Sequence, residues 1–411
     1  MTSVTNNVPV TPSTTSFQSG VSEHPDGVIA AREAVSAALH GRVPASQDLI
    51  VLFSSTIYDT HAVHESALLA AHGVPLVGCS VSSGGSFAET GSARPGISAT
   101  HIPAGDTVFG IGSVSDLGSN LADGARRASV IARERAGEVH PHSALMLLSD
   151  GLAGDLREIV RGAHQATGPS VPTIGGAAGD LDFSGTYQFA EGNTYTNGLV
   201  AIWINSPTPI GVAVRHGWRE VGAPMLVTRA EGNIIYELDG LPALQTFLDQ
   251  HQLLRGEAAH ASLTNHGPIA QQTLGLELFD TPLGIASLSG RYDVRHISGV
   301  AADGTSLCMF GSVPEHAVVQ LMTSDSDDLL EGARAASIEA ASQLDGDARG
   351  VLVFSCVARS LLLGARLPEE HLGISQVLGG APSCGFYTFS EYARVSGSTG
   401  FHNASVAVLA L

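Results

Sequence analysis

The chain has no lysine, and the 20 basic residues among its 411 are all arginines. A mechanism that needs a Schiff-base lysine, or the lysine of a phosphate-binding P-loop, is therefore excluded. Charged residues of both signs make up only 14% of the chain and hydrophobic residues 44%, which is typical of a compact globular protein of two or three domains. The formal net charge of −19 argues against binding to nucleic acid or to an anionic membrane surface.

Long apolar runs and paired cysteines are also missing. No apolar stretch approaches the roughly 18 residues of a membrane span. Residues 1–25 have neither the basic nor the apolar segment of a signal peptide, so we expect a disordered tail on a cytoplasmic protein. No CxxC pair occurs, and reduced, chiefly buried thiols are expected at the four cysteines, Cys79, Cys308, Cys356 and Cys384. The 17 histidines include no pair at metal-binding spacing with a third ligand nearby, so no metal site is predicted.

One pattern occurs three times along the chain. An apolar strand ends in a serine, and a second strand follows that begins with a proline and has a glycine three residues later. The matching residues are Ser54, Pro75 and Gly78, then Ser149, Pro172 and Gly175, then Ser355, Pro382 and Gly385. A helix-length segment separates the two strands in each copy, which is the signature of a parallel βαβ unit. Residues 101–205 repeat as 312–411, with 107–111 and 317–322 as opening strands.

These patterns predict a mixed, layered α/β fold. Duplicated β-α-β-α-β-β units would form an N-terminal lobe over residues 26–210 and a C-terminal lobe over residues 211–411. Between the copies, residues 210–311 show short apolar runs separated by turn signals, such as Glu231-Gly232-Asn233, which predict a mostly antiparallel central segment.

Several motifs occur together in one order. They are VPTIGGAAGD at 171–180, the segment 227–244, FSCVAR at 354–359, GFYTFSE at 385–391 and FHN at 401–403. In these motifs the sequence resembles the FIST family, named for F-box and intracellular signal transduction proteins, over nearly the whole chain from about residue 30. The sequence departs from the family pattern at Ser390, where a glycine is usual, and in residues 83–86, which lack the usual acid.

The resemblance implies a sensory protein of signal transduction that binds small molecules such as amino acids. No output module accompanies it here, so the output is expected from a partner in trans, such as a histidine kinase or a cyclic-dinucleotide enzyme. Two alternatives stay open, a haem-bearing nitric-oxide sensor and a protein-interaction scaffold without a ligand. No cofactor is otherwise expected. No catalytic residue is assigned, because Cys356 would be a nucleophile only beside a base or positive charge that lowers its pKa.

The candidate ligand-binding residues follow the strand ends of the C-terminal lobe. The Arg359 fork suits a ligand carboxylate, and Glu391 suits an ammonium group; alternatively the two form a structural salt bridge. Because the carboxyl ends of parallel strands share one edge of a sheet, Arg359, Glu391, Tyr387 and Asn403 are expected to converge on one cavity. The carboxylate and ammonium groups of an amino acid would then both find partners.

The remaining candidates each have a structural alternative. His402 could ligate haem or sense pH, or it could be a hydrogen-bonded core histidine. Asn403 could bind a ligand amide or stabilise a turn. Asp180, together with Gly175 and Gly176, could form a second pocket in the N-terminal lobe, or the aspartate could stabilise a turn.

Overall fold

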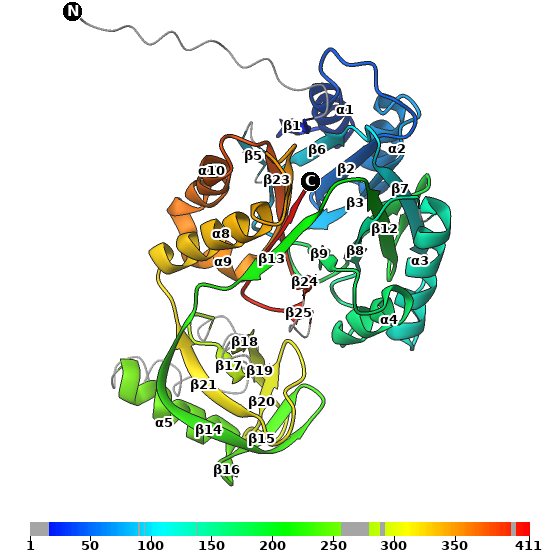
Figure 1. Cartoon of the computed structure of the whole chain (residues 1–411). Helices are drawn as coiled ribbons and strands as arrows, with labels where there is room; N and C mark the ends of the chain where they lie inside the picture. Colours follow the sequence, from blue (N-terminus) through cyan, green and yellow to red (C-terminus); the bar gives the residue numbers. More distant parts are fainter. Residues whose placement is uncertain are drawn as a thin grey trace, which may run out of the picture.

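The computed structural model describes residues 16–88, 91–93, 95–137, 139–255, 279–287, 292–395 and 400–411. Three copies of one strand–helix unit pack together, with their helices outside and their sheets facing inward, and an antiparallel lobe adjoins them (Figure 1). The fold is therefore mixed α/β with duplicated units and an antiparallel central segment, as the sequence predicts.

Each copy has the same order of elements: a strand, a helix, a strand, helical structure and four further strands. The first copy comprises β1 (Gln18–Ser22), α1 (Gly27–Ala38), β2 (Leu49–Ser55), α2 (Thr60–Ala70), β3 (Leu76–Val81), β4 (Ser86–Ala88), β5 (Gly91–Ala93) and β6 (Ile97–Ile102). The second comprises β7 (Val108–Val114), α3 (Leu121–Ala136), β8 (His142–Ser149), α4 (Arg157–Thr167), β9 (Thr173–Ala177), β10 (Gln188–Ala190), β11 (Asn193–Tyr195) and β12 (Leu199–Ser206). The third comprises β13 (Gly211–Arg215), α8 (Ser326–Ala341), β22 (Val351–Cys356), α9 (Val357–Leu363), the 3-10 helix Gly364–Arg366, α10 (Pro368–Val377), β23 (Ser383–Thr388), β24 (Glu391–Arg394), β25 (Phe401–His402) and β26 (Val406–Ala410).

The repeated glycines mark close approach of two parallel strands in every copy. Gly78, Gly175 and Gly385 pair in register with Leu52, Leu147 and Val353. A Cβ at any of the three would lie within 2.0 Å of the partner's carbonyl oxygen, so only glycine fits. The alignment of the three copies on these glycines is thus confirmed.

Each sheet takes its last two strands from another copy. The first copy's sheet has the order β1-β6-β2-β3-β10-β11, the second's β7-β12-β8-β9-β24-β25 and the third's β13-β26-β22-β23-β4-β5. The second copy thus donates a hairpin to the first, the third donates one to the second, and the first donates one to the third. This cyclic hairpin exchange links all three copies through main-chain hydrogen bonds.

The opening strand of the third copy is not where the sequence placed it. Residues 317–322 coincide largely with β21 (Val318–Thr323), which pairs with strands of the antiparallel lobe. The equivalent of β1 and β7 is β13, since each of these three strands pairs with the final strand of its own copy. His24, Asp116 and His216, just beyond these strands, each accept a hydrogen bond from the N–H two residues later. An insertion between β13 and α8 displaced the sequence alignment.

The expected tail over residues 1–25 is wrong in its last part. Residues Gln18–Ser22 form β1, which pairs antiparallel with β6 along its full length. Phe17, in front of β1, is 2% exposed and packs in the central core. Residues 1–15 lie outside the described residues. The lobe boundary expected at residue 210 falls between β12 and β13 and stays a prediction.

The antiparallel lobe is the inserted segment. It comprises β14 (Arg219–Glu231), β15 (Ile234–Leu238), β16 (Leu241–Pro242), α5 (Ala243–Arg255), β17 (Leu283–Ala286), β18 (Tyr292–Arg295), β19 (Ile297–Val300), β20 (Leu307–Met309) and β21. The strands form one curled sheet by antiparallel pairing (Figure 1). The lobe has a core of its own that includes Met225, Phe247 and Leu307. The lobe is thus a separate layer attached to the third copy.

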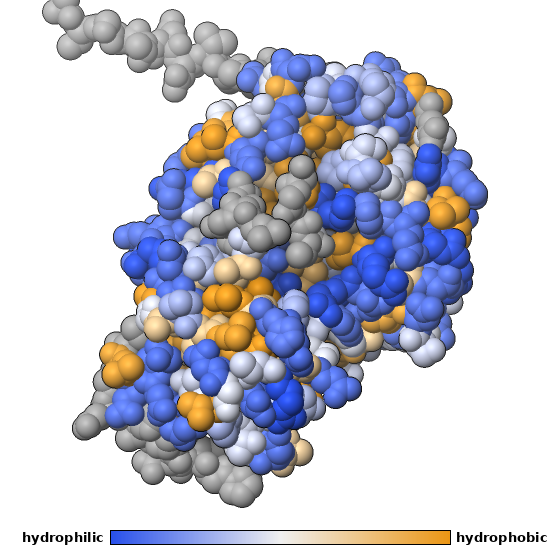
Figure 2. Space-filling model, turned by 60° about the horizontal axis from the view of Figure 1, so that its bottom comes forward, coloured by the Kyte–Doolittle hydropathy of each residue, from blue (hydrophilic) through white to orange (hydrophobic). Residues whose placement is uncertain are grey.

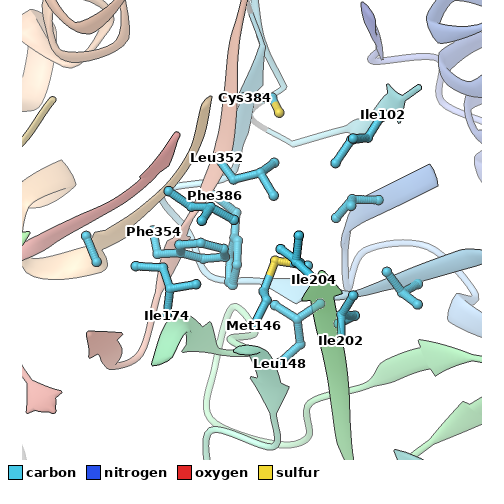
Figure 3. Close-up of a cluster of buried hydrophobic side chains, with 14 of the residues drawn as sticks. Ile102, Met146, Leu148, Ile174, Ile202, Ile204, Leu352, Phe354, Cys384 and Phe386 are labelled. Atoms are coloured by element: carbon cyan, nitrogen blue, oxygen red, sulfur yellow. The ribbon is translucent and has the colours of Figure 1, made fainter. Parts of the chain in front are cut away.

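A single apolar core lies where the three sheets face one another. Its side chains come from every copy, and Figure 3 shows Met146, Ile202, Phe354 and Phe386 directed toward the same space. The Phe386 ring lies 4.5 Å, centroid to centroid, from that of Phe53 in the first copy. Since burial of each such side chain contributes about 1.5–3 kcal/mol, this shared core holds the three copies together.

Candidate functional site

Arg359 lies in the first turn of α9 and is completely buried. Its Nη2 is 2.6 Å from Glu370 Oε1, and its Nε also donates to that oxygen, at 2.9 Å. The guanidinium further donates to the carbonyl oxygens of His216 and Leu329. The salt bridge considered with Glu391 is therefore wrong, because α10 brings Glu370 against the arginine instead.

Glu370 organises the polar cluster at this strand end. Besides the Arg359 ion pair, it accepts hydrogen bonds from the Tyr387 hydroxyl, at 2.8 Å, and from Ser355 Oγ. Glu370 was not predicted from the sequence, although its position in the helix indicates burial. Glu370 and Ile374 are four residues apart and therefore lie on the same, buried face of α10. The arginine fork and the tyrosine hydroxyl are thus joined through a carboxylate of the chain itself.

Glu391 opens β24 and is also completely buried. It accepts hydrogen bonds from Thr388 Oγ1, from the Ser405 N–H at 3.1 Å and from Ser405 Oγ at 2.8 Å. Burial raises the pKa of this carboxyl to about 7, against the partial opposition of these hydrogen bonds. Burial, and secondarily the charge of Glu391, raises the pKa of the Cys356 thiol well above its ordinary value. The thiol of Cys356 is therefore not activated as a nucleophile.

His402 and Asn403 sit at the end of the same hairpin. His402 is 8% exposed, and its Nε2 is 3.1 Å from the Ala393 carbonyl oxygen. Burial lowers the pKa of its imidazole. Asn403 Nδ2 donates to Ser390 Oγ, while its buried Oδ1 has no hydrogen-bond partner among the described residues. Both residues therefore serve as packed, hydrogen-bonded side chains in this structure.

The predicted residues gather at one sheet edge, but as two buried clusters. One is the Arg359–Glu370–Tyr387 network, and the other surrounds Glu391. Thr388 connects them, because its hydroxyl lies within hydrogen-bond distance of both the Ser355 carbonyl oxygen and Glu391. None of these residues lines either of the two cavities described below. A ligand-binding role for them stays a prediction.

Asp180 and the paired glycines lie at the corresponding edge of the second copy. The Asp180 carboxylate accepts hydrogen bonds from three successive N–H groups, those of Phe183, Ser184 and Gly185. It therefore stabilises the turn after β9. A Cβ at Gly176 would lie 2.4 Å from Thr388 Cγ2, and a Cβ at Gly175 would meet the Leu147 carbonyl, so both glycines serve close packing.

The turn that Asp180 shapes forms one wall of an open cleft of about 450 Å³. The other wall follows β2 and includes the start of α2. The lining residues are Thr56, Tyr58, Asp59, Thr60, His61, Leu181, Asp182, Ser184, Gly185 and Tyr187. A second cavity, of about 210 Å³, lies beside Asp48 and β7. Sequence reasoning missed the 450 Å³ cleft, because its two walls come from different copies and meet only through the hairpin exchange.

Comparison with known proteins identifies the family. A model of the FIST N domain matches residues 48–241, and one of the FIST C domain matches residues 259–394. The chain belongs to the FIST family. FIST domains are sensory domains of signal transduction.

The relatives of this FIST protein match part of its length. An uncharacterized protein of Mycobacterium bovis is 27% identical over 235 residues, which are 57% of this chain and 58% of the relative. An uncharacterized protein of Mycobacterium tuberculosis is 28% identical over 237 residues, 57% and 59% of the two chains. One from Methanocaldococcus jannaschii is 33% identical over 81 residues, 20% of this chain and 16% of its own. The match thus spans less than two thirds of these relatives.

Two features are absent from the described part of this FIST protein. Within it, no helix is long and apolar enough to cross a membrane. Nor do three or more histidine, cysteine or acidic side chains come together there in a group that could hold a metal ion.

The first and third copies of this FIST protein differ where their strands end. The Tyr58 hydroxyl donates to the His24 carbonyl, as Arg359 donates to the equivalent His216 carbonyl. In the third copy the donated hairpin closes the edge, since a Cβ at Gly84 would lie 2.3 Å from Tyr387 Cβ. In the first copy the chain donated by the second copy does not close the edge, and the 450 Å³ cleft remains open there. The open crevice is therefore in the N-terminal part.

Proposed function

We propose that this FIST protein is a small-molecule-binding sensory protein for ligands of amino-acid size, with its output through a partner in trans. The 450 Å³ cleft carries the proposal. Its volume lies in the roughly 300–1,000 Å³ range of small-molecule sites, and it lies at the carboxyl end of β2, where α/β sheets bind ligands. The family's sensory role supports the same reading.

A partner would need an accessible surface. Figure 2 shows apolar patches interrupting a mainly hydrophilic surface, with some of them on and beside the antiparallel lobe. Leu226, Leu241 and Val318 of that lobe are 40%, 59% and 44% exposed. Such side chains suit contact with another protein, and the proposed partners are a histidine kinase or a cyclic-dinucleotide enzyme.

The haem alternative is less well supported. A haem ligand needs a ring nitrogen that faces open space, whereas His402 is buried and its Nε2 already contacts the Ala393 carbonyl. This geometry does not favour His402 as an iron ligand. The visible spectrum of the purified protein tests the alternative directly, since a Soret band would support it.

A ligand screen tests the main proposal. Thermal shift with amino acids and related amines should yield a stabilising ligand, and calorimetry should give its affinity. Ser184→Trp fills the cleft without changing its charge and should abolish binding. Ser119→Trp, at an exposed position outside the cleft, should not. A ligand that binds the Ser184→Trp variant as tightly as the unaltered protein would contradict the cleft as the site.

A further inference from the structure

We propose that the 450 Å³ cleft selects ligands that carry a positively charged amine and no carboxylate. This inference rests on the proposed function, and it names the chemical class that the same site would bind. It departs from the amino-acid ligand implied by the family resemblance, because two carboxylates and no arginine line the cleft.

The charge of the lining is the first observation. Two carboxylates, Asp59 and Asp182, line the cleft, and no arginine does. Asp59 Oδ1 caps α2 by accepting from the N–H groups of His61 and Ala62, which leaves Oδ2 for a ligand. Within the described chain, the Asp182 carboxylate has no hydrogen-bond or ion-pair partner, whereas Glu158 and Glu369 on other surfaces pair with arginines. Two carboxylate groups with unused oxygens therefore face one opening.

A hydroxyl without a partner is the second and independent observation. Thr60 lines the cleft and is 6% exposed, yet its hydroxyl has no hydrogen-bond partner among the described residues. This hydroxyl can therefore form a hydrogen bond with water or with a ligand in the cleft. The Thr60 oxygen can accept a hydrogen bond from an ammonium group. Tyr58 and Tyr187 add aromatic rings to the lining, and aromatic faces attract ammonium groups.

The start of α2 does not offer a site for an anion. A helix N-terminus attracts anions through its free N–H groups, but the Asp59 side chain already occupies those of His61 and Ala62. The carboxylate of an amino acid in the cleft would thus meet the negative charges of Asp59 and Asp182, and the only basic side chain among the lining residues is that of His61. The net charge of −19 also concentrates cations around the molecule. Both effects favour amines over zwitterions and anions.

A series of ligands that each contain four carbon atoms tests the selectivity. Calorimetry is carried out on the full chain with 1,4-diaminobutane, 1-aminobutane, 4-aminobutanoate and butanedioate. The two amines should bind, 4-aminobutanoate should bind at least about tenfold more weakly than 1-aminobutane, and butanedioate should not bind. Equal or tighter binding of 4-aminobutanoate or butanedioate would overturn the inference.

Two substitutions test the residues. Asp182→Asn and Asp59→Asn should each weaken 1,4-diaminobutane binding by about tenfold, because each removes one charge-assisted contact. Asparagine caps a helix as well as aspartate, so Asp59→Asn should leave the thermal midpoint almost unchanged. The matched control is Asp106→Asn, because Asp106 lines the smaller cavity instead. This variant should bind 1,4-diaminobutane as tightly as the unaltered protein. Unchanged affinity in both Asp59→Asn and Asp182→Asn would also overturn the inference.

Failure of this inference differs from failure of the proposed function. If 4-aminobutanoate, butanedioate or an amino acid binds at least as tightly as the amines, and Ser184→Trp abolishes that binding, the cleft is a ligand site but the amine selectivity is wrong. If neither the series nor the amino acids bind the unaltered protein, the sensory proposal for this cleft and the inference fall together.

Discussion

Replacing Glu391 by glutamine should change how the stability of the protein depends on pH. Glu391 is completely buried, and its pKa is about 7 in the folded protein compared with an ordinary value of 4.5. Between these values the folded state holds a proton that the unfolded state has lost. The stabilisation is therefore full below pH 4.5 and is lost as the pH rises through 7. Glutamine has the same shape, keeps an oxygen for Ser405, and does not titrate.

The size of the effect follows from the shift in pKa. One pKa unit corresponds to about 1.4 kcal/mol, so Glu391 makes the free energy of unfolding depend on pH by roughly 3 kcal/mol in total. About 2 kcal/mol of this is lost between pH 5.5 and pH 8.5. The free energy of unfolding of the unaltered protein, relative to Glu391→Gln, should fall by that amount over this interval. The lower limit lies above the isoelectric point of about 5.2, which keeps the protein charged.

Buried histidines act in the opposite direction and make the comparison with a variant necessary. Burial lowers the pKa of His64 to about 4, of His216 to about 4 and of His296 to about 3. Their stabilisation is full above the ordinary value of 6.5 and is lost as the pH falls through the folded-state values. Because both proteins contain these histidines, their contribution cancels in the difference.

Urea unfolding followed by tryptophan fluorescence, at pH 5.5 and pH 8.5, measures both free energies. Glu134→Gln, at an exposed position on α3, is the matched control and should track the unaltered protein at both pH values. A Glu391→Gln difference that is the same at both pH values, or that changes with the opposite sign, would refute the claim that burial raises the pKa of Glu391.

Three further predictions concern packing. Arg359→Met should lower the free energy of unfolding by about 3–5 kcal/mol, because Glu370 keeps a buried charge without its partner, and adding Glu370→Leu should restore most of the loss. Urea unfolding of the single and double variants measures both free energies. Losses from the two substitutions that simply add would contradict the prediction. Gly175→Ala should lower the thermal midpoint far more than Gly232→Ala, because both have positive φ but only the Cβ at 175 would lie 2.0 Å from a carbonyl oxygen of β8. Residues 1–210 produced alone should give a poorly dispersed amide NMR spectrum, because their second sheet lacks β24 and β25; a well-dispersed spectrum would show that the hairpin exchange is dispensable.

The sequence predicts what is local and repeated. The Ser–Pro–Gly spacing located the parallel strand pairs in all three copies, since Gly175 and Gly385 occupy equivalent register positions. It misassigned residues 317–322, because an apolar strand of the antiparallel lobe has the same pattern as the true equivalent, β13. Strand partners distant in sequence follow from packing that no local pattern encodes, so the hairpin exchange was not predicted.

The candidate site shows the same limit. Arg359 was correctly placed beyond a strand end, but its partner Glu370 is selected by how α10 packs on the sheet. The sequence offers Glu369 beside it with equal chemistry, and Glu369 is exposed and pairs with Arg366. The cleft was missed for a related reason, since Asp59 and Asp182 approach each other only when the second copy's hairpin joins the first copy's sheet.

The cyclic exchange has a consequence for synthesis on the ribosome. The first sheet can be completed once β10 and β11 have emerged. However, β9 keeps an open edge until its partner β24 has been made, and β4 cannot pair until β23 has been made. Open strand edges pair with other chains, and pairings distant in sequence form slowly. The nascent chain therefore carries open edges until almost its last residues have been made, and chaperones that cover strand edges should matter most immediately before its release.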